Sequence, residues 1–338
     1  MDGDSGELTA PCTQTPQSSQ QPPQHKRRRL TNRRLPAPGV DNGQTCTKTL
    51  PIANVPYHAD YKGSMWNAQA LFASDPSKQK AKRDFTTHLI NDHDFLGILE
   101  THGTQGVEQA TQPPTGCRAF WSHGTASVAG IGLVIKQTFL QQFNPTHDDD
   151  WVHIVPGRVG RLSLRGALGC LDIVVAYFPT GQEGAHDRMA IMDKISHHIQ
   201  SRETTLTVMI GDWNFVLEDN DRFSKSTGAW SGAQDRKNAE HWEMRLQTPH
   251  KLHELQQPHY TCDQPGVARS RIDRIYTNHF ASDQLDRHYS CTVLLGDQPL
   301  GTPSNIFCSC HAKAQTFFGK TIASRTDPSP RLGAASSA

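Results

Sequence analysis

The sequence MIGDWNFVLEDNDR, residues Met209 to Arg222, passes from an apolar run to a polar, acidic one without a spacer. The apolar part belongs to Thr205–Gly211 (TLTVMIG), whose β-branched composition indicates a short buried strand. Asp212 and Asn214 therefore come directly after that strand. An Asp-x-Asn sequence in this position is more often a turn than a functional pair. Its interpretation depends on how the other strands of the chain end.

Two other apolar runs also end on a polar group. Phe95–Leu99 (FLGIL) precedes Glu100, and Cys170–Phe178 (CLDIVVAYF) carries Tyr177 near its end. Asp273 lies within a strand-like segment, SRIDRIY. Strand ends at one edge of a sheet can converge, and rigid sheets present functional groups in this way. We therefore expect the following side chains to meet at one edge: Asn67, Glu100, Asp212, Asn214 and Asp273.

The remaining periodic segments define the fold class. A further strand is expected at Ala129–Ile135 (AGIGLVI), and apolar residues spaced for a helix precede the first and last of the predicted strands. Strands outnumber helices, which predicts an α/β or α+β protein. The two helical stripes are Ala81, Phe85 and Leu89, and Met189, Met192, Ile195 and Ile199.

The composition divides the 338 residues into a body and two tails. Residues 1–50 are rich in Pro, Gln, Ser and Thr and are expected to be disordered, because such a segment buries too little apolar surface to order itself. Residues 319–338 have the same character, which leaves 51–318 as one domain. The first tail contains HKRRRLTNRR, His25 to Arg34. This run is either a solvated charge run or a nuclear-import signal or nucleic-acid arm, and we expect a nuclear protein.

Charge and cysteine content restrict the function classes. The net charge is +1, with +3 in residues 1–50 and −2 in the rest, so a polyanion must be bound through a local basic groove or a metal. The eight cysteines form no CxxC pair, and neither a secretory leader nor an apolar run of about 20 residues is expected, so no membrane partner is expected either. Reduced thiols are therefore expected. A zinc hydrolase is disfavoured because no HExxH occurs.

The ordered motifs resemble the endonuclease/exonuclease/phosphatase superfamily of metal-dependent phosphoesterases, from about Ser64 to about Phe318. MWNAQAL is similar to the opening strand, LGILETHG to the metal-binding Glu motif, and VAYFPTG to the Tyr-x-Pro motif. GDWNFVLEDNDR and SRIDRIY are most similar to the endonuclease domains of non-long-terminal-repeat retrotransposons. The resemblance implies a four-layer α/β/β/α sandwich, with two packed, mainly antiparallel mixed sheets flanked by helices.

The resemblance also implies roles for individual residues in phosphodiester hydrolysis. Mg²⁺, or Mn²⁺ in its place, would be bound by Glu100 with Asn67 beside it. Asp212 would hold or deprotonate the attacking water, and Asn214 would orient the phosphate. Tyr177 and His311 would donate to phosphoryl oxygens. The remaining implied roles are orientation of His311 by Asp273 and weak contacts to the substrate phosphate by Arg271 and Arg274.

Two positions depart from the family pattern. Gln69 stands where an Asp often follows the opening Asn, and Cys310 stands where the closing Ser-Asp-His motif has its Asp. A neutral thiol is a poor Mg²⁺ ligand, because this ion prefers oxygen. Cys310 is therefore expected to weaken metal binding while leaving the Asp273–His311 pair intact.

Three functions remain open on the sequence. The leading prediction is an Mg²⁺-dependent DNA endonuclease, with DNA as its partner. The first alternative is a catalytically silent nucleic-acid-binding domain, which Cys310 favours. The second is a phosphatase acting on lipids or inositol phosphates with the same fold. The basic run in the first tail and the arginines that flank Asp273 favour nucleic acid.

Overall fold

The computed structural model describes residues 49–72, 74–107, 112–125, 127–255 and 259–280, together with the backbone of Arg287–Leu294 and Phe307–Ala314. All of the described residues belong to one compact unit. The two predicted tails lie outside the described residues, apart from positions 49 and 50. The same holds for the basic run from His25 to Arg34.

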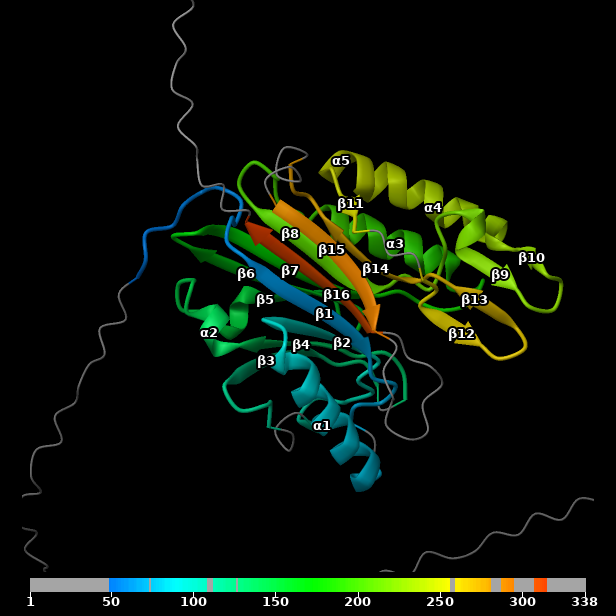
Figure 1. Cartoon of the computed structure of the whole chain (residues 1–338), viewed down its shortest axis with the longest axis horizontal. Coiled ribbons are helices and arrows are strands. Elements are labelled where there is room, and N and C mark those ends of the chain that lie inside the picture. The colour runs from blue at the N-terminus through cyan, green and yellow to red at the C-terminus, as the bar shows by residue number, and fades with distance from the viewer. Residues whose placement is uncertain are drawn as a thin grey trace, which may run out of the picture. The chain divides into compact units, whose positions relative to one another are not determined.

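Two six-stranded mixed sheets form the body (Figure 1). Their strand orders are β15-β16-β1-β2-β4-β3 and β11-β14-β8-β7-β6-β5. Pairing is antiparallel in both, except that β1 runs parallel to β2 and β7 runs parallel to β8. The strands of the first sheet are β1 (Tyr61–Asn67), β2 (Phe95–Leu99), β3 (Cys117–Ser122), β4 (Ile131–Lys136), β15 (Arg287–Leu294) and β16 (Phe307–Ala314); those of the second are β5 (Trp151–Val155), β6 (Val159–Gly166), β7 (Gly169–Tyr177), β8 (Leu206–Asp212), β11 (His253–Glu254) and β14 (Asp273–Thr277).

Helices cover the outer face of each sheet, and the apolar side chains form three clusters between the layers. One cluster joins the two sheets and includes Leu133 from the first sheet and Ile173 and Ile210 from the second. A second lies between α1 (Pro76–Asn91) and the first sheet. The third lies between the second sheet and α3 (Ala185–Ser196) with its neighbours. These four layers confirm the predicted sandwich of two sheets flanked by helices (Figure 1).

The shorter helices complete the outer layers. Most of them consist of only one or two turns. They are α2 (Gln137–Leu140), η2 (Asp148–Asp150), η3 (Asp219–Asp221), η4 (Gly232–Asp235), α4 (Arg236–Trp242), η5 (Glu243–Gln247) and α5 (Thr248–His250).

The four predicted strands are present with small shifts. FLGIL is β2, and the runs expected at Ala129–Ile135, Cys170–Phe178 and Thr205–Gly211 are β4, β7 and β8, each displaced by one or two residues. Both helical stripes are also helices. The first begins where Asp75 accepts hydrogen bonds from the N–H groups of Ser77 and Lys78, with Pro76 at the first position. The second ends at Ser196, so Ile199 lies beyond it.

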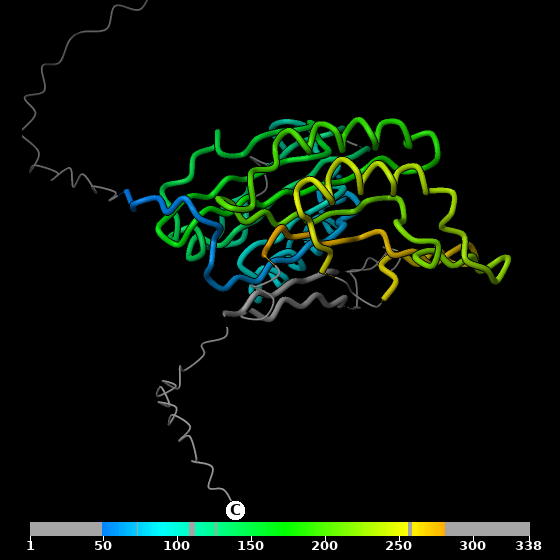
Figure 2. The backbone as a smooth tube through the Cα atoms, turned by 90° about the horizontal axis from the view of Figure 1, so that it is seen from above, coloured from blue at the N-terminus to red at the C-terminus, as the bar shows by residue number. Residues whose placement is uncertain are grey.

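A third, small sheet was not predicted. It has the order β10-β9-β13-β12, and in Figures 1 and 2 it extends beyond one end of the two large sheets. Its strands are only two or three residues long, too short to leave a period in the sequence. They are β9 (Arg222–Ser224), β10 (Ala229–Trp230), β12 (Cys262–Gln264) and β13 (Ala268–Ser270).

Two global features can be read from the described residues. None of their helices is both long and apolar enough to cross a membrane. The described cysteines, Cys117, Cys170 and Cys262, are free thiols.

Candidate active site

The site lies at one edge of the sandwich. There the ends of two parallel strand pairs, β1 with β2 and β7 with β8, meet the start of β14. Asn67 pairs with Leu99 at the ends of β1 and β2, which places Asn67 beside Glu100. Tyr177 pairs with Asp212 at the ends of β7 and β8, and Asp212 pairs in turn with Asp273. The structure therefore brings together the five side chains that were predicted to meet, and Tyr177 lies beside them.

Glu100 lies at the centre of this group. Its Oε1 accepts a hydrogen bond of 2.8 Å from Asn67 Nδ2 and one of 2.9 Å from the Tyr177 hydroxyl. Its Oε2 lies 3.7 Å from His102 Nε2, beyond hydrogen-bond distance. One carboxylate oxygen is thus fixed by two donors, one from each sheet, and the other accepts no hydrogen bond from the residues that the structure describes.

Asp212 is the second carboxylate. It is buried, and its Oδ1 accepts the Asn214 backbone N–H at 2.8 Å, while the Asn67 side chain also donates to it. Burial, assisted by the negative charge of Glu100, raises the pKa of Asp212 to about 7, although both hydrogen bonds act in the opposite direction. A carboxylate with this pKa can both hold and release a proton near neutral pH.

Asp273 is the third carboxylate. Burial raises its pKa well above the usual value, and the nearby charges of Asp212 and Glu100 add to the effect. The Thr261 hydroxyl opposes it by donating to the Asp273 carboxylate, and Thr261 Oγ1 also accepts the Asp273 backbone N–H at 2.9 Å. Three carboxylates therefore share one edge, where the charge of Glu100 disfavours ionisation of both Asp212 and Asp273.

The other two predicted residues are held in place by local contacts. The Asn214 side chain donates to the Phe178 carbonyl at 2.8 Å, which links the ends of β8 and β7. Burial and the carboxylates of Glu100 and Asp212 raise the pKa of Tyr177, so its hydroxyl remains a donor at any physiological pH. Gly211, next to Asp212, is required by packing, because a Cβ there would lie 2.0 Å from the Ala176 carbonyl oxygen.

The backbone is strained at this edge. Seven non-glycine residues of the described chain have positive φ, and six of them lie in the loops around the three carboxylates. Such conformations cost of order 1–3 kcal/mol each and cluster at functional sites. The six are Gln69 (43°), Ala70 (72°), Glu100 (53°), His102 (51°), Ala129 (62°) and Asn214 (51°).

Several neighbours were not predicted from the sequence. His102 follows Glu100 by two residues, so the motif LETHG contained a signal for it. Lys82 comes from α1, is mostly buried, and donates to the carbonyls of Gln69 and Ala70. The Arg158 guanidinium lies 4.9 Å from the centre of the Tyr177 ring. Lys82 and Arg158 reach the site from distant segments, and no local pattern marks them.

Arg271 and Arg274, the two arginines predicted to contact the substrate phosphate, lie in an internal ion-pair cluster. Both are buried and bind Asp221 and Glu254, with Arg271 Nε 2.8 Å from Asp221 and Arg274 Nη1 2.6 Å from Glu254. Arg274 also binds Asp221 and the Arg271 carbonyl. The two arginines thus neutralise an internal acidic pair and fix the loop of Asp221 and the strand of Glu254 onto β14.

The backbone position of His311 does not support its predicted place in the site. In β16 it pairs with Lys62, five residues before Asn67 on β1, and Cys310 pairs with Gly63. At about 3.3 Å per residue this is roughly 16 Å from the strand end. The predicted hydrogen bond between His311 and Asp273 is a side-chain contact and lies outside what the structure describes. The backbone register therefore gives no support to a place for His311 among the carboxylates at the strand ends.

The residues at this edge fit a hard divalent cation in part. No group of three or more His, Cys, Asp or Glu side chains placed to hold a metal occurs in the part of the chain that the structure describes. Mg²⁺ does not need one, because it retains several waters and commonly uses one or two carboxylates. Glu100 Oε2 provides such an oxygen, and a cation there would relieve the mutual repulsion of Glu100, Asp212 and Asp273.

Comparison with known proteins supports the fold. No family model and no curated protein sequence matches the chain. Among solved structures, a humanized D. rerio TDP2 with 14 mutations matches with a TM-score of 0.54 and 11% identity, over 76% of this chain and 100% of the other. An AP endonuclease from Archaeoglobus fulgidus matches with a TM-score of 0.51 and 15% identity, over 74% and 98%. The Leishmania major AP endonuclease LMAP gives 0.53 and 13%, over 75% and 88%.

These structures have the endonuclease/exonuclease/phosphatase fold, so the comparison confirms the fold that the motifs predicted. At identities of 11–15% it carries no residue roles. A further match, with a TM-score of 0.53 and 12% identity over 76% of this chain and 100% of the other, is D. rerio TDP2 in complex with a single-strand DNA product.

Proposed function

We propose that the chain is a metal-dependent phosphodiesterase that cleaves DNA, an endonuclease of the retrotransposon type. The observation that carries this proposal is the convergence of Glu100, Asp212 and Asp273 at one strained edge, bridged by Asn67 and Tyr177. A phosphodiester is difficult to hydrolyse because water is a poor nucleophile and the transition state is anionic. This edge holds a base for the water and donors for the anion.

Asp212 is the base in this proposal. Its pKa of about 7 matches the requirement that a general base be near the working pH, and its contacts with Asn67 and Asn214 hold its carboxylate in one orientation. Tyr177 keeps its proton and can donate to a phosphoryl oxygen. A divalent cation bound at Glu100 would neutralise charge that develops on the phosphoryl oxygens.

DNA is the proposed substrate for two reasons. Two of the structures with this fold are AP endonucleases, and D. rerio TDP2 was solved with a single-strand DNA product. The motifs GDWNFVLEDNDR and SRIDRIY are most similar to the retrotransposon endonucleases. Together these support DNA over a lipid or an inositol phosphate.

A plasmid assay tests the proposal directly. The full chain is expected to nick supercoiled plasmid with Mg²⁺ or Mn²⁺, and EDTA should abolish the nicking. Glu100→Gln should abolish it as well, because the substitution removes the charge that would hold the cation. Glu203→Gln, an exposed glutamate of the turn before β8, is the matched control and should nick at the wild-type rate. Nicking that is insensitive to EDTA and to Glu100→Gln would refute the proposal.

A catalytically silent DNA-binding domain is the second candidate. The register of β16 favours it, since the backbone of His311 lies along the strand and not at its end. In that case the protein would bind labelled DNA in a mobility-shift assay but would not nick it at any concentration of Mg²⁺ or Mn²⁺.

We also propose that the protein is nuclear, on the strength of the basic run from His25 to Arg34. A fluorescent reporter that carries residues 20–40 should accumulate in the nucleus. A reporter in which the five arginines and the lysine of the run are replaced by Gln is the control. Equal distribution of both reporters would refute the role of this run.

A further inference from the structure

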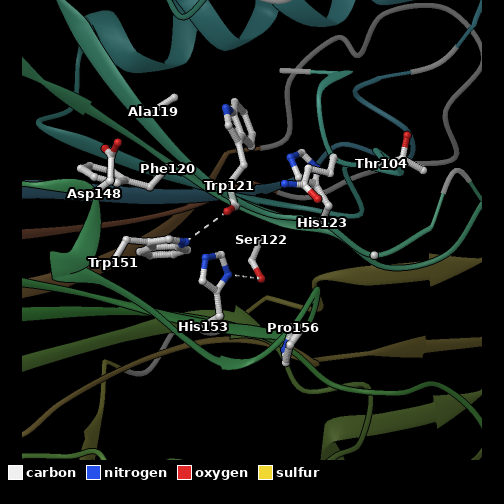
Figure 3. A pocket seen from close by; sticks show the side chains of 12 residues that line it. Thr104, Ala119, Phe120, Trp121, Ser122, His123, Asp148, Trp151, His153 and Pro156 are labelled. Atoms are coloured by element: carbon white, nitrogen blue, oxygen red, sulfur yellow. Dashed lines mark hydrogen bonds between the residues drawn. The ribbon is translucent and has the colours of Figure 1, made fainter. Parts of the chain in front are cut away.

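A cavity of about 640 Å³ lies at the side of the sandwich, between the outer strands of the two large sheets (Figure 3). Residues of β3 and the turn that follows it form one wall, and Trp151 and His153 of β5 form the other. Thr104 and Gln105, from the loop after β2, close one end. None of the candidate active-site residues lines this cavity.

Hydrogen bonds connect the cavity to the loop that carries Glu100. Ser122 Oγ, in the cavity wall, accepts the Gly157 N–H at 2.9 Å, and the Gly157 carbonyl accepts the Gly130 N–H at 2.9 Å. The Gly130 carbonyl then accepts the N–H of Thr101, the residue after Glu100. The cavity wall and the active-site loop are therefore held in one rigid arrangement.

The cavity lies close to the proposed cleavage position. A Cβ on Gly103 would be 3.1 Å from His123 Nδ1, so the wall touches the loop three residues after Glu100. Three residues of chain span at most about 10 Å. Successive phosphates of a DNA strand are about 3.4 Å apart along the helix axis, so the cavity is within about three nucleotides of the scissile phosphate.

The lining suits an uncharged aromatic ring better than a phosphate. The twelve lining residues include no Lys or Arg, and Asp148 is the one charged group among them. Trp121, His123 and His153 present ring faces or edges, while Gln105 and Thr104 offer polar groups. A nucleobase has a flat π surface, which can stack on the rings, and a rim of hydrogen-bond donors and acceptors, which can pair with the polar groups.

The rings are fixed before any ligand arrives. Trp121 packs edge-on against Phe72, with ring centres 5.1 Å apart, and its carbonyl accepts the Trp151 Nε1–H at 3.2 Å. His153 Nδ1 lies 2.9 Å from Ser122 Oγ. Because Ser122 Oγ already accepts from Gly157, this arrangement favours donation of the hydroxyl proton to Nδ1, which leaves the His153 Nε2–H as a donor.

We propose that this cavity binds one nucleobase of the DNA strand next to the scissile phosphate. The inference rests on the proposed function, since it supposes that DNA lies across the edge at Glu100. It adds a base-binding site about one to three nucleotides from the cleavage position, with Trp121 as the stacking surface and His153 as a hydrogen-bond donor.

The test compares two labelled single-stranded oligomers of equal length in EDTA, so that cleavage plays no part. One carries bases, and the other is the same sugar–phosphate backbone without bases. The measured quantity, by fluorescence anisotropy, is the Kd of the base-free oligomer divided by the Kd of the oligomer that carries bases. Removing the aromatic side chain removes its stacking on the base, so Trp121→Ala should reduce the wild-type ratio by about 5- to 150-fold.

Three further variants separate base binding from folding. His153→Ala, at an exposed position of β5, should reduce the ratio by about 2- to 12-fold, the effect of losing one hydrogen bond. His186→Ala, at an exposed position of α3, is the matched control and should leave it unchanged. Trp121→Phe keeps a ring and should restore most of the ratio. Thermal unfolding checks that each variant is folded.

The outcomes distinguish this inference from the proposed function. If the wild type binds and nicks DNA but the ratio is unchanged in folded His153→Ala and Trp121→Ala, the base-binding site is refuted and the nuclease stands. If the wild type binds neither oligomer nor duplex DNA, both are refuted.

Discussion

The molecule contains two groups of carboxylates, buried or half-buried, that differ in how far nearby cations neutralise them. Asp221 and Glu254 are neutralised by Arg271 and Arg274, which bind them through several short contacts. Burial alone would raise the pKa of Asp221, but the two guanidinium groups more than offset it and lower that pKa below its usual value. In this internal cluster, two positive guanidinium groups balance two negative carboxylates.

The carboxylates at the strand ends are less fully neutralised by the cations that the structure describes, since Arg274 only partly offsets the raised pKa of Asp273. Glu100, Asp212 and Asp273 each contribute to a raised pKa at this edge, and the groups that approach them are mainly amides and hydroxyls. Paired buried charge indicates a structural role, whereas uncompensated buried charge costs stability and is retained where a ligand or a reaction needs it. The two clusters interleave in sequence, and they differ because the guanidinium groups neutralise Asp221 and Glu254 more completely than any described cation neutralises the carboxylates at the strand ends.

The largest expected difference between the clusters is in the rate of cleavage. Asp212→Asn removes the proposed base and should lower the plasmid-nicking rate by about 10²–10⁴-fold. It should also raise the free energy of unfolding, because an amide at this buried position avoids the cost of ionisation. Asp219→Asn, an exposed aspartate in η3, should change neither quantity. A loss of stability in Asp212→Asn without loss of rate would reverse the assignment of the two clusters.

The internal cluster should show its effect in stability. Arg274→Met leaves Asp221 and Glu254 without one of their two partners in a buried environment, and breaking such a pair costs about 3–5 kcal/mol. Urea unfolding measures the change. Arg236→Met is the control, because this exposed arginine is 3.9 Å from Asp219 and should contribute within about 0.5 kcal/mol. If Arg274→Met were as stable as Arg236→Met, the cluster would not have the structural role described.

The two clusters should respond to pH with opposite signs. The folded pKa of Asp212, about 7, is above its usual 3.8, so the folded state holds this proton more tightly than the unfolded state. Its contribution to stability is therefore full below about pH 4 and declines as pH rises from about 4 to 7. The folded pKa of Asp221 is lowered, so its contribution is present above about pH 4 and is lost as pH falls through the folded pKa.

Unfolding free energies measured at intervals from pH 3 to 8 check these signs. In Asp212→Asn the decline between about pH 4 and 7 should flatten, by up to about 1.4 kcal/mol for each pH unit in which the folded protein alone holds the proton. In Asp221→Asn the loss at the acid end should disappear. An unchanged slope in Asp212→Asn would show that its pKa is not raised in the folded protein.

The strand ends could be predicted because their information is local. Asp212 and Asn214 follow an apolar strand within three residues, and the same holds for Glu100 and Tyr177. Parallel strands then bring their carboxyl ends to one edge whatever the connections between them. The sequence could not reveal Lys82 or the cavity between β3 and β5, because these depend on which strands are outermost and on how a helix packs.

The arginines show where local information is misleading. SRIDRIY places Arg271 and Arg274 beside Asp273, which suggested substrate contacts. Arg274 directly follows Asp273 in β14, so the two side chains point to opposite faces of the sheet, and Arg271 lies before the strand begins. Their partners, Asp221 and Glu254, lie about fifty and about twenty residues away, and no spacing rule connects them. A basic residue next to a site residue in sequence is therefore weak evidence for a role in the site.

The smallest expected effect is at His311, where the closing motif and the strand register disagree. If His311 donated to a phosphoryl oxygen, His311→Ala would lower the nicking rate by about 10²–10³-fold. Its backbone pairs with Lys62, about 16 Å along β1 from Asn67, so we expect a change of less than about threefold. Tyr177→Phe is the comparison, because it removes a hydroxyl that does reach Glu100 and should lower the rate by more than tenfold. A large loss in His311→Ala would instead mean that β16 pairs with β1 in a shifted register in the working enzyme. His311 would then join the three carboxylates at the strand ends in the site.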